Sequence, residues 1–300
     1  MKLGYIGLGK MGSAMVKRLV EYGHEVIVYD AEAATVQLAM QHGAQGSDSI
    51  ENLIEALPSD RIIWIMVPHV AVEAVLGKIL PLLQEGDTVI DGGNSYYKDS
   101  ISRHELFFRK GIGYIDVGVS GGPSGARDGA CLMIGGEKKH FEKCEKIFQD
   151  IALPNGYRYV GNAGAGHFVK MIHNGIEYGM MQAIGEGFAI MQKAPLDLRL
   201  GEIADLYGHG SVISSRLIEW LSDAYKKFGD GLQGEECCVG SVAHSGEGEW
   251  TVKTAEEFGV AAPAIKASFD FRVASQADPS YNGQVVSALR FMFGGHNAKP

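Results

Sequence analysis

One glycine-rich turn near the start of the chain, Gly7-Leu8-Gly9-Lys10-Met11-Gly12, constrains the fold more than any other segment. It follows a short apolar stretch, Lys2 to Ile6, and it precedes a helical pattern that continues to Gly23. In such a strand-turn-helix setting the first glycine permits a tight turn, the second lets backbone approach a pyrophosphate, and the third lets the helix pack on the strand. The turn therefore predicts a dinucleotide-binding α/β domain.

An acidic residue supports this interpretation and indicates which dinucleotide is bound. A second apolar stretch, Glu25 to Tyr29, ends at Asp30, about 20 residues after the turn, where such domains carry an acid. A turn that served packing alone would explain the glycines but not this acid. A carboxylate here accepts hydrogen bonds from the ribose 2′-hydroxyl and repels a 2′-phosphate, and the next residues, Ala31-Glu32-Ala33, offer no arginine to receive one. We expect NAD, with NADP less favoured.

A phosphate-binding P-loop is the competing interpretation of the same turn, because Gly4, Gly9 and Lys10 have the spacing with which that motif begins. The next residue is Met11, whereas the P-loop places a serine or threonine there to ligate magnesium. The sequence therefore argues against a nucleoside triphosphatase.

Strand and helix patterns alternate through the first half of the chain, as in a doubly wound α/β sheet. Ligands of such sheets bind beyond the carboxyl ends of the strands, where two glycine-rich loops lie, Asp91 to Ser95 and Val119 to Gly125. Each loop alone is compatible with an ordinary surface turn, but two beside a dinucleotide site favour anion binding through exposed backbone N–H groups. The predicted strands cover residues 61–66, 88–91, 114–117, 131–134 and 158–160, and the helices cover 72–83, a segment ending near 110, and 138–151.

Helical periodicity replaces the strand patterns in the second half. The chain of 300 residues is long enough for two domains. We expect an N-terminal Rossmann-type domain over residues 1–162, and an all-α domain over 163–300 that serves substrate binding and oligomerisation and ends in a C-terminal arm. The predicted helices of the second domain cover residues 165–191, 198–207, 213–225, 252–258, 264–275 and 284–291.

Composition narrows the classes of partner. The formal net charge is −9 and there is no cluster of lysine and arginine, which argues against a nucleic-acid partner. The chain begins directly as a strand, without a signal-peptide pattern, and no apolar run approaches membrane-spanning length, so we expect a cytoplasmic protein without a membrane partner. The cysteines have no metal-ligand spacing and are expected to be reduced thiols: Cys131, Cys144, Cys237 and Cys238.

The segment from Gly164 to Gly187 carries four chemically competent side chains at helical spacing i, i+3, i+4 and i+7: Lys170, His173, Asn174 and Glu177. A solvated helix face with a Lys/Glu pair is the simpler interpretation, but it requires the polar face to continue, and that face becomes apolar further along. We therefore expect a largely buried helix, on which Lys170 and Glu177 perform acid/base catalysis. The apolar residues of its other faces are Val169, Ile172, Ile176, Met180 and Ala183.

The chain resembles the β-hydroxyacid dehydrogenases from end to end, and within them the short form of the 6-phosphogluconate dehydrogenases. The wider family is indicated by YIGLGKMGSAM, by VSGG, and by GAGHFVK with an asparagine four residues after the lysine. The narrower branch is indicated by DGGNS, VKMIHNGIEYG and GEGEWT.

The resemblance implies oxidative decarboxylation of 6-phosphogluconate to ribulose 5-phosphate in the pentose phosphate pathway, with Lys170 as general base and Glu177 as general acid. Tyr178 and Arg272 would hold the phosphate, and Arg290 and His296 would reach a neighbouring subunit's site in a homodimer or homotetramer. Ser245 stands where longer relatives carry a phosphate-binding lysine. The remaining substrate residues would be Asn94, Ser120, Gly121, Gly122, His173 and Asn174, and the cofactor residues would be Gly7, Leu8, Gly9, Lys10, Met11, Gly12, Asp30, Val67, Pro68 and Asn94.

The residues support this chemistry independently of the family. A buried lysine can take a hydroxyl proton while hydride leaves for nicotinamide, and an acid can later protonate the enediol carbon. No acidic cluster has metal-ligand spacing, so we expect no metal. Two alternatives remain open, a dehydrogenase of a small hydroxy acid without phosphate and a catalytically silent NAD-binding sensor. The second would have no need for both Lys170 and Glu177 on a buried face.

Overall fold

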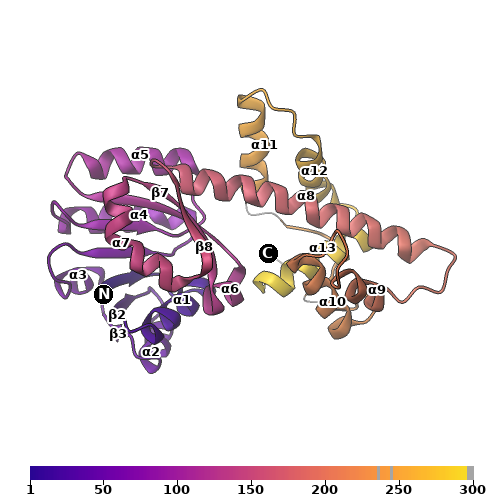
Figure 1. Cartoon of the computed structure of the whole chain (residues 1–300), viewed down its shortest axis with the longest axis horizontal. Helices are drawn as coiled ribbons and strands as arrows, with labels where there is room; N and C mark the ends of the chain where they lie inside the picture. The colour runs from indigo at the N-terminus through magenta and orange to yellow at the C-terminus, as the bar shows by residue number, and fades with distance from the viewer. Residues whose placement is uncertain (235–236, 244–245, 296–300) are drawn as a thin grey trace. The chain divides into compact units, whose positions relative to one another are not determined.

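The computed structural model of the chain describes residues 1–234, 237–243 and 246–295. The chain divides into two compact units, Met1–Met171 and Ile172–Pro300. The point of division lies inside one long helix (Figure 1). The sequence placed the domain boundary slightly earlier, at residues 162–163, where the strand patterns end.

Unit 1 is built on an eight-stranded sheet with the order β3-β2-β1-β4-β5-β6-β7-β8. All neighbouring strands are parallel except β6 and β7, which are antiparallel. The strand order reverses between β1 and β4, the position at which doubly wound sheets bind ligands. The strands are β1 (Lys2–Ile6), β2 (Glu25–Tyr29), β3 (Gln45–Gly46), β4 (Ile62–Ile65), β5 (Thr88–Asp91), β6 (Gly113–Ser120), β7 (Ala130–Gly136) and β8 (Ala152–Gly161).

Both faces of the central strands are covered, which explains why these strands are apolar throughout. In β4, Trp64 points into the core cluster that includes Tyr5 and Phe148, whereas Ile63 and Ile65 point into the cluster on the opposite face. Helices lie on both sides of the sheet (Figure 1). The helices of unit 1 are α1 (Lys10–Glu21), α2 (Ala33–Gln41), α3 (Ile50–Glu55), α4 (His69–Ile79), α5 (Tyr97–Phe108), α6 (Gly122–Asp128) and α7 (Lys138–Ile151), with a 3₁₀ turn at Leu80–Leu82.

The predicted doubly wound α/β class is confirmed, but four elements were not predicted: α2, β3, α3 and α6. The structure also corrects the second glycine-rich loop. Val119 and Ser120 end strand β6, Gly121 caps helix α6, and the helix begins at Gly122 with Pro123 in its first turn. Proline suits the first turn of a helix, so the run of glycine and proline marks a helix start rather than a long loop.

The described part of unit 2 is helical, as predicted. Its core joins Met181 and Phe188 of helix α8 to Tyr225 of α10 and to Val285 and Leu289 of α13. Serine side chains cap α10 and α13 by accepting the backbone N–H groups of residues 218 and 283. The helices are α8 (Ala165–Lys193), which begins in unit 1, α9 (Leu200–Tyr207), α10 (Arg216–Phe228), α11 (Glu247–Glu257), α12 (Pro263–Ser275) and α13 (Tyr281–Gly294).

Helix α8 is less buried than its sequence predicts. The side chains of Val169, Ile176 and Met180 are 36%, 53% and 43% exposed, although the expectation was that their faces would be covered. Met181 and Phe188, on the continuation of the polar face, are buried as expected. The amphipathic pattern predicted that apolar residues pack, but an apolar face can equally remain exposed on a single chain.

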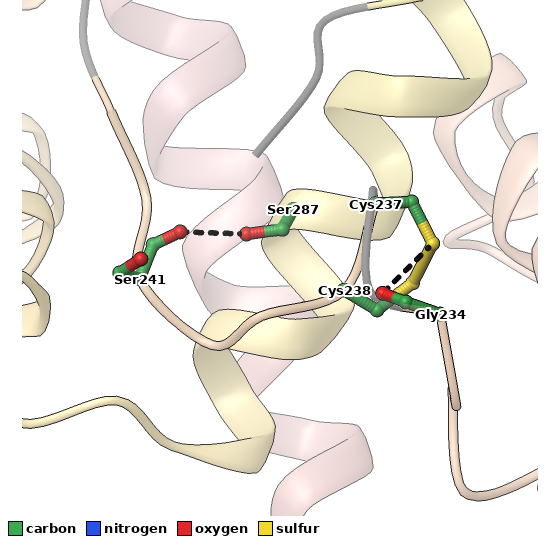
Figure 2. The surroundings of a disulfide bond; sticks show 5 residues. All are labelled: Gly234, Cys237, Cys238, Ser241 and Ser287. Carbon is green, nitrogen blue, oxygen red and sulfur yellow. Dashed lines mark hydrogen bonds between the residues drawn. A yellow bond between two sulfur atoms is a disulfide. The ribbon is translucent and has the colours of Figure 1, made fainter. Parts of the chain in front are cut away.

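The expectation of four reduced cysteines is wrong for one pair, because Cys237 and Cys238 form a disulfide (Figure 2). Both residues are buried, and the segment that follows them is fixed to α13, where the hydroxyl of Ser287 donates to the carbonyl oxygen of Ser241 at 3.0 Å. The sequence did not indicate this bond, because the C-x-x-C pattern concerns cysteines separated by two residues and these two are adjacent. Cys131 and Cys144 are free thiols.

In the parts of the chain that the structure describes, no helix combines the length and the apolar character needed to cross a membrane.

Candidate active site

The glycine turn after β1 has the conformation that its sequence predicts. Gly7 adopts a φ of 101°, and a side chain there would collide with the carbonyl of Met66. A side chain at Gly12 would collide with the carbonyl of Gly7, so the helix packs on the turn only because this residue is glycine. At Gly9, by contrast, an added Cβ would meet nothing within 4 Å. This open backbone fits a dinucleotide pyrophosphate approaching the start of α1.

Asp30 is hydrogen-bonded to the same turn. One carboxylate oxygen accepts the backbone N–H of Leu8 at 2.6 Å, and the other accepts the N–H of Glu32 at 2.8 Å. A carboxylate oxygen has two lone pairs, so each can accept a further hydrogen bond from a ribose hydroxyl. Asp30 thus shapes the glycine turn and presents acceptors where the ribose of a dinucleotide would lie.

A buried network fixes the loop after β5. Asp91 accepts hydrogen bonds from Ser95 at 2.8 Å, Tyr114 at 2.9 Å and Arg103 at 3.1 Å through one oxygen, and from the N–H of Gly93 at 3.1 Å through the other. All three side-chain donors are buried. Asn94 lies exposed at the tip of this loop. The loop therefore presents Asn94 from a rigid base at the carboxyl edge of the sheet.

The remaining sheet-edge residues also follow parallel strands. Val67 and Pro68 come after β4, and Ser120 ends β6. Gly121 and Gly122 have φ values of 120° and 62°, which glycine adopts without steric cost. Because β1, β4, β5 and β6 run parallel, these segments lie at the same edge as the glycine turn.

The start of α8 is fixed on β6 by a buried carboxylate. Asp116 accepts the backbone N–H groups of Gly164 and His167, each at 2.8 Å. A side chain at Gly118 would collide with Lys170, so β6 and α8 approach closely because position 118 is glycine. These contacts place Lys170 against Gly118 of β6, the strand that ends at Ser120.

The other residues of the predicted polar face lie further along α8, in unit 2. His173 Nδ1 lies 3.1 Å from the side-chain oxygen of Asn174 and 3.8 Å from a carboxylate oxygen of Glu177. Asn174 is buried, whereas the side chains of His173 and Glu177 are 35% and 22% exposed. The face is thus partly open and can receive a polar ligand.

Tyr178 and Arg272 form the most distinctive contact of unit 2. The guanidinium carbon of Arg272 lies 3.3 Å from the centroid of the Tyr178 ring, and both residues are buried. Gly248 of α11 packs on the same ring, since an added Cβ would lie 2.5 Å from it. Burial lowers the pKa of Arg272 to about 10, which still leaves it cationic at neutral pH. Among the described residues, Arg272 takes part in no ion pair and donates one long hydrogen bond, to the sulfur of Met181 at 3.7 Å.

Arg290 and Glu247 belong to the same electrostatic environment. Burial lowers the pKa of Arg290, and the nearby Tyr178, Glu247 and Glu177 oppose that shift. Arg290 in turn contributes to lowering the pKa of Arg272. Two buried or partly buried guanidinium groups, held near each other in this way, favour an anionic ligand.

The predicted site residues therefore fall into two sets. Unit 1 holds the residues for the cofactor together with Asn94, Ser120 to Gly122 and Lys170. Unit 2 holds His173, Asn174, Glu177, Tyr178, Arg272 and Arg290. Ser245 and His296 lie outside the described residues. In the described ranges, no group of three or more His, Cys, Asp and Glu side chains has an arrangement that could hold a metal ion.

Several supporting residues carry no signal that the sequence patterns singled out: Asp116, Gly118, Arg103, Tyr114 and Glu247. Glu247 lies within the GEGEWT motif, which could have indicated it. The contacts of Asp116 and Arg103 join segments far apart in the chain, and no local pattern indicates them.

Two family models match nearly the whole chain. The NAD-binding domain of 6-phosphogluconate dehydrogenase matches residues 2–161, and the C-terminal domain of 6-phosphogluconate dehydrogenase matches residues 166–290.

Individual relatives agree with these models. The Bacillus subtilis protein YqeC, provisionally named as a 6-phosphogluconate dehydrogenase, is 46% identical over 99% of this chain and 98% of its own length. The NAD(+)-dependent, decarboxylating 6-phosphogluconate dehydrogenase of Haloferax volcanii is 40% identical over 99% of this chain and 98% of its own. The solved 6-phosphogluconate dehydrogenase of Plasmodium falciparum superposes with a TM-score of 0.80 at 30% identity, covering 92% of this chain and 62% of that longer one. The chain belongs to the 6-phosphogluconate dehydrogenase family of oxidoreductases.

Proposed function

We propose that this protein oxidises and decarboxylates 6-phospho-D-gluconate to D-ribulose 5-phosphate and carbon dioxide, with reduction of NAD. The observation that carries the proposal is Arg272, a buried cation stacked on Tyr178 and without an ion pair among the described residues. Burial disfavours the charged form of this guanidinium, and a substrate phosphate would supply a direct anionic partner. Arg290 would add a second guanidinium to a phosphate, from a neighbouring subunit or from its own chain.

Lys170 and Glu177 act at different steps in this proposal. NAD, when bound, supplies the acceptor for the hydride that leaves the substrate's C3. Lys170 takes the proton of the C3 hydroxyl and then, as an ammonium, hydrogen-bonds the ketone oxygen while the carboxylate leaves as carbon dioxide. Glu177, two helical turns further along α8, donates a proton to the carbon that lost the carboxylate, so the enediolate becomes the product ketone. Asn94, Ser120 to Gly122, His173 and Asn174 orient the sugar acid.

The preference for NAD is supported by Asp30. Both of its oxygens are held in place by backbone N–H groups, so the carboxylate is fixed where a 2′-phosphate would have to lie. Repulsion between these two anions disfavours NADP.

The proposal further assigns the chain to the short form of the family. This is supported by YqeC and the Haloferax volcanii enzyme, each of which aligns with this chain over 98% of its own length, whereas the alignment covers 62% of the Plasmodium falciparum chain. We also propose a homo-oligomer, dimer or tetramer, in which Arg290 and His296 complete a neighbouring site. The exposed Ile176 and Met180 of α8 offer apolar surface for such contacts. In the competing arrangement Arg290 serves its own chain, because burial lowers its pKa there and Tyr178 of the same chain is near enough to oppose that shift.

One experiment separates this function from oxidation of a hydroxy acid without phosphate. The purified protein is assayed with 6-phosphogluconate and with gluconate, following NADH absorbance and released carbon dioxide. The proposal expects kcat/KM to be about a hundredfold or more higher for the phosphorylated acid, because a site built for a polar group rejects the analogue lacking it. Equal use of gluconate would favour the alternative, and no turnover of either would favour a silent NAD-binding protein.

A further inference from the structure

Glu247 is a buried acid that the proposed reaction does not use. It is 4% exposed and lies in the first turn of α11. The next residue, Gly248, packs on the ring of Tyr178, and Arg272 stacks on that same ring. One aromatic ring thus brings the start of α11 and the guanidinium of Arg272 together.

Acidic and basic side chains both lie near this ring. Arg272 and Arg290 are the basic ones, and the carboxyl groups of Glu177 and Glu247 lie near both of them. Glu247 raises the pKa of both arginines, against the larger lowering that burial causes. It therefore lies close enough to act on the cations that would hold the phosphate.

We propose that Glu247 is a specificity-determining residue that balances the charge of Arg272 and Arg290 in the absence of substrate and opposes the second negative charge of a bound phosphate. This inference rests on the proposed function, since it takes the Arg272 cluster as the seat of the substrate's phosphate. A carboxylate near a dianion repels it twice as strongly as it repels a monoanion at the same place, because Coulomb energy scales with ligand charge. Glu247 therefore reduces the extent to which the site binds a dianion more tightly than a monoanion.

The test uses the full-length protein and two tetrahedral probes of similar size, the dianion sulfate and the monoanion methyl sulfate. Binding is measured from the rise in Tm with probe concentration, at constant ionic strength set with sodium chloride. Glu247→Gln removes the charge and keeps the shape of the side chain. We expect it to lower the Kd for sulfate about tenfold, and the Kd for methyl sulfate by about the square root of that factor.

Glu249→Gln is the matched control. Glu249 lies in the same turn of α11 but pairs with Lys253 at 2.6 Å and is 38% exposed, so its loss should leave both Kd values unchanged. Arg272→Met should abolish sulfate binding and thereby assign the binding to this cluster.

Equal changes for the two probes, or no change, would overturn the proposal, because a purely structural role has no dependence on ligand charge. The proposal is also overturned if Glu247→Gln unfolds the protein and sulfate does not restore the folded state. Glu247→Ala repeats the test with a side chain that has no amide. Binding of the two probes does not require turnover, so this result can be interpreted even if the proposed reaction does not occur.

Discussion

The guanidinium carbon of Arg272 lies over the ring of Tyr178, 3.3 Å from the ring centroid. The two residues come from different helices, α12 and α8, and Gly248 of α11 packs on the same ring. A guanidinium held over an aromatic face keeps N–H groups that an anion such as a phosphate can accept two at a time. The contact therefore fits the phosphate-binding role that we propose for Arg272.

Replacement of Lys170 tests the proposed base. Lys170→Met should lower kcat by about 10²–10⁴-fold, the usual effect of losing an acid/base group, and should leave substrate binding largely intact. Steady-state kinetics with NADH detection and a binding titration measure the two effects. Lys193→Met, at the exposed end of the same helix, is the control and should retain activity. Near-normal turnover of Lys170→Met would remove the lysine from the mechanism.

Cofactor preference should depend on Asp30 and its neighbour. Asp30→Ser together with Ala31→Arg should shift kcat/KM toward NADP, because a repulsive carboxylate is removed and a phosphate partner is added. Ala31→Arg alone is the informative control, since it keeps the hydrogen bonds of Asp30 to Leu8 and Glu32. The assignment of NAD is wrong if the unmodified protein already has the higher kcat/KM with NADP.

Subunit mixing tests where Arg290 acts. Arg290→Ala should raise KM for the phosphorylated substrate more than it lowers kcat, because a phosphate contact binds rather than reacts. Mixing Arg290→Ala subunits with Lys170→Met subunits should restore partial activity if the C-terminal arm serves a neighbour, since one hybrid site then contains both intact residues. No recovery in verified hybrids would show that Arg290 serves its own chain.

Two glycines of α8 should respond oppositely to alanine. An added Cβ at Gly175 would lie 2.6 Å from Thr251 of α11, whereas at Gly179 it would meet nothing within 4 Å. Gly175→Ala should therefore destabilise the protein by about 1–3 kcal/mol through overpacking. Gly179→Ala should stabilise it by up to about 1 kcal/mol through helix propensity. Urea unfolding of both variants measures the difference, and equal effects would contradict the close packing of α8 on α11.

Stability at mildly acidic pH should depend on His24, whose Nε2 lies 2.8 Å from Asp150. Burial lowers the pKa of His24 from 6.5, so the folded state favours the neutral imidazole. Its contribution is present above pH 6.5 and is lost as the pH falls through and below that value. His24→Gln removes this titration. Between pH 7 and 5 the Tm of the variant should therefore fall less than the Tm of the wild type, and the two falls should differ by about 2–4 °C. The pKa of Asp150 is also lowered, and its contribution is lost only below pH 3.8, outside this window. A parallel fall in both proteins would contradict this assignment.

Local patterns predicted much of the fold. The strand Thr88–Asp91 and the helix Lys138–Ile151 have the predicted bounds, because alternation and helical periodicity are strong there. Residues 33–55 were not assigned, since short helices and a two-residue strand leave too few apolar positions for a period to appear. The glycine turn was predictable because its steric requirement is local.

The geometry of the candidate site was less predictable. Asp91 could be placed in a glycine-rich loop, but its bonds to Arg103 and Tyr114 depend on how β5, α5 and β6 pack. Tyr178 and Arg272 were each singled out by resemblance, yet their stacking is a tertiary contact that no spacing in the sequence encodes. The exposure of Ile176 was missed for the same reason, since hydrophobicity does not tell which apolar face a single chain leaves uncovered.

Asp30 accepts a hydrogen bond through each of its two carboxylate oxygens, and this constrains how the coenzyme preference of the chain could change in evolution. Replacing the acid first would release the N–H groups of Leu8 and Glu32 and loosen the turn on which any dinucleotide depends. A mutational path that gains the arginine at position 31 first keeps that turn intact, and only then does loss of the acid carry an advantage. The order of the two substitutions, and not only their identity, therefore decides whether natural selection can follow the path to a new coenzyme.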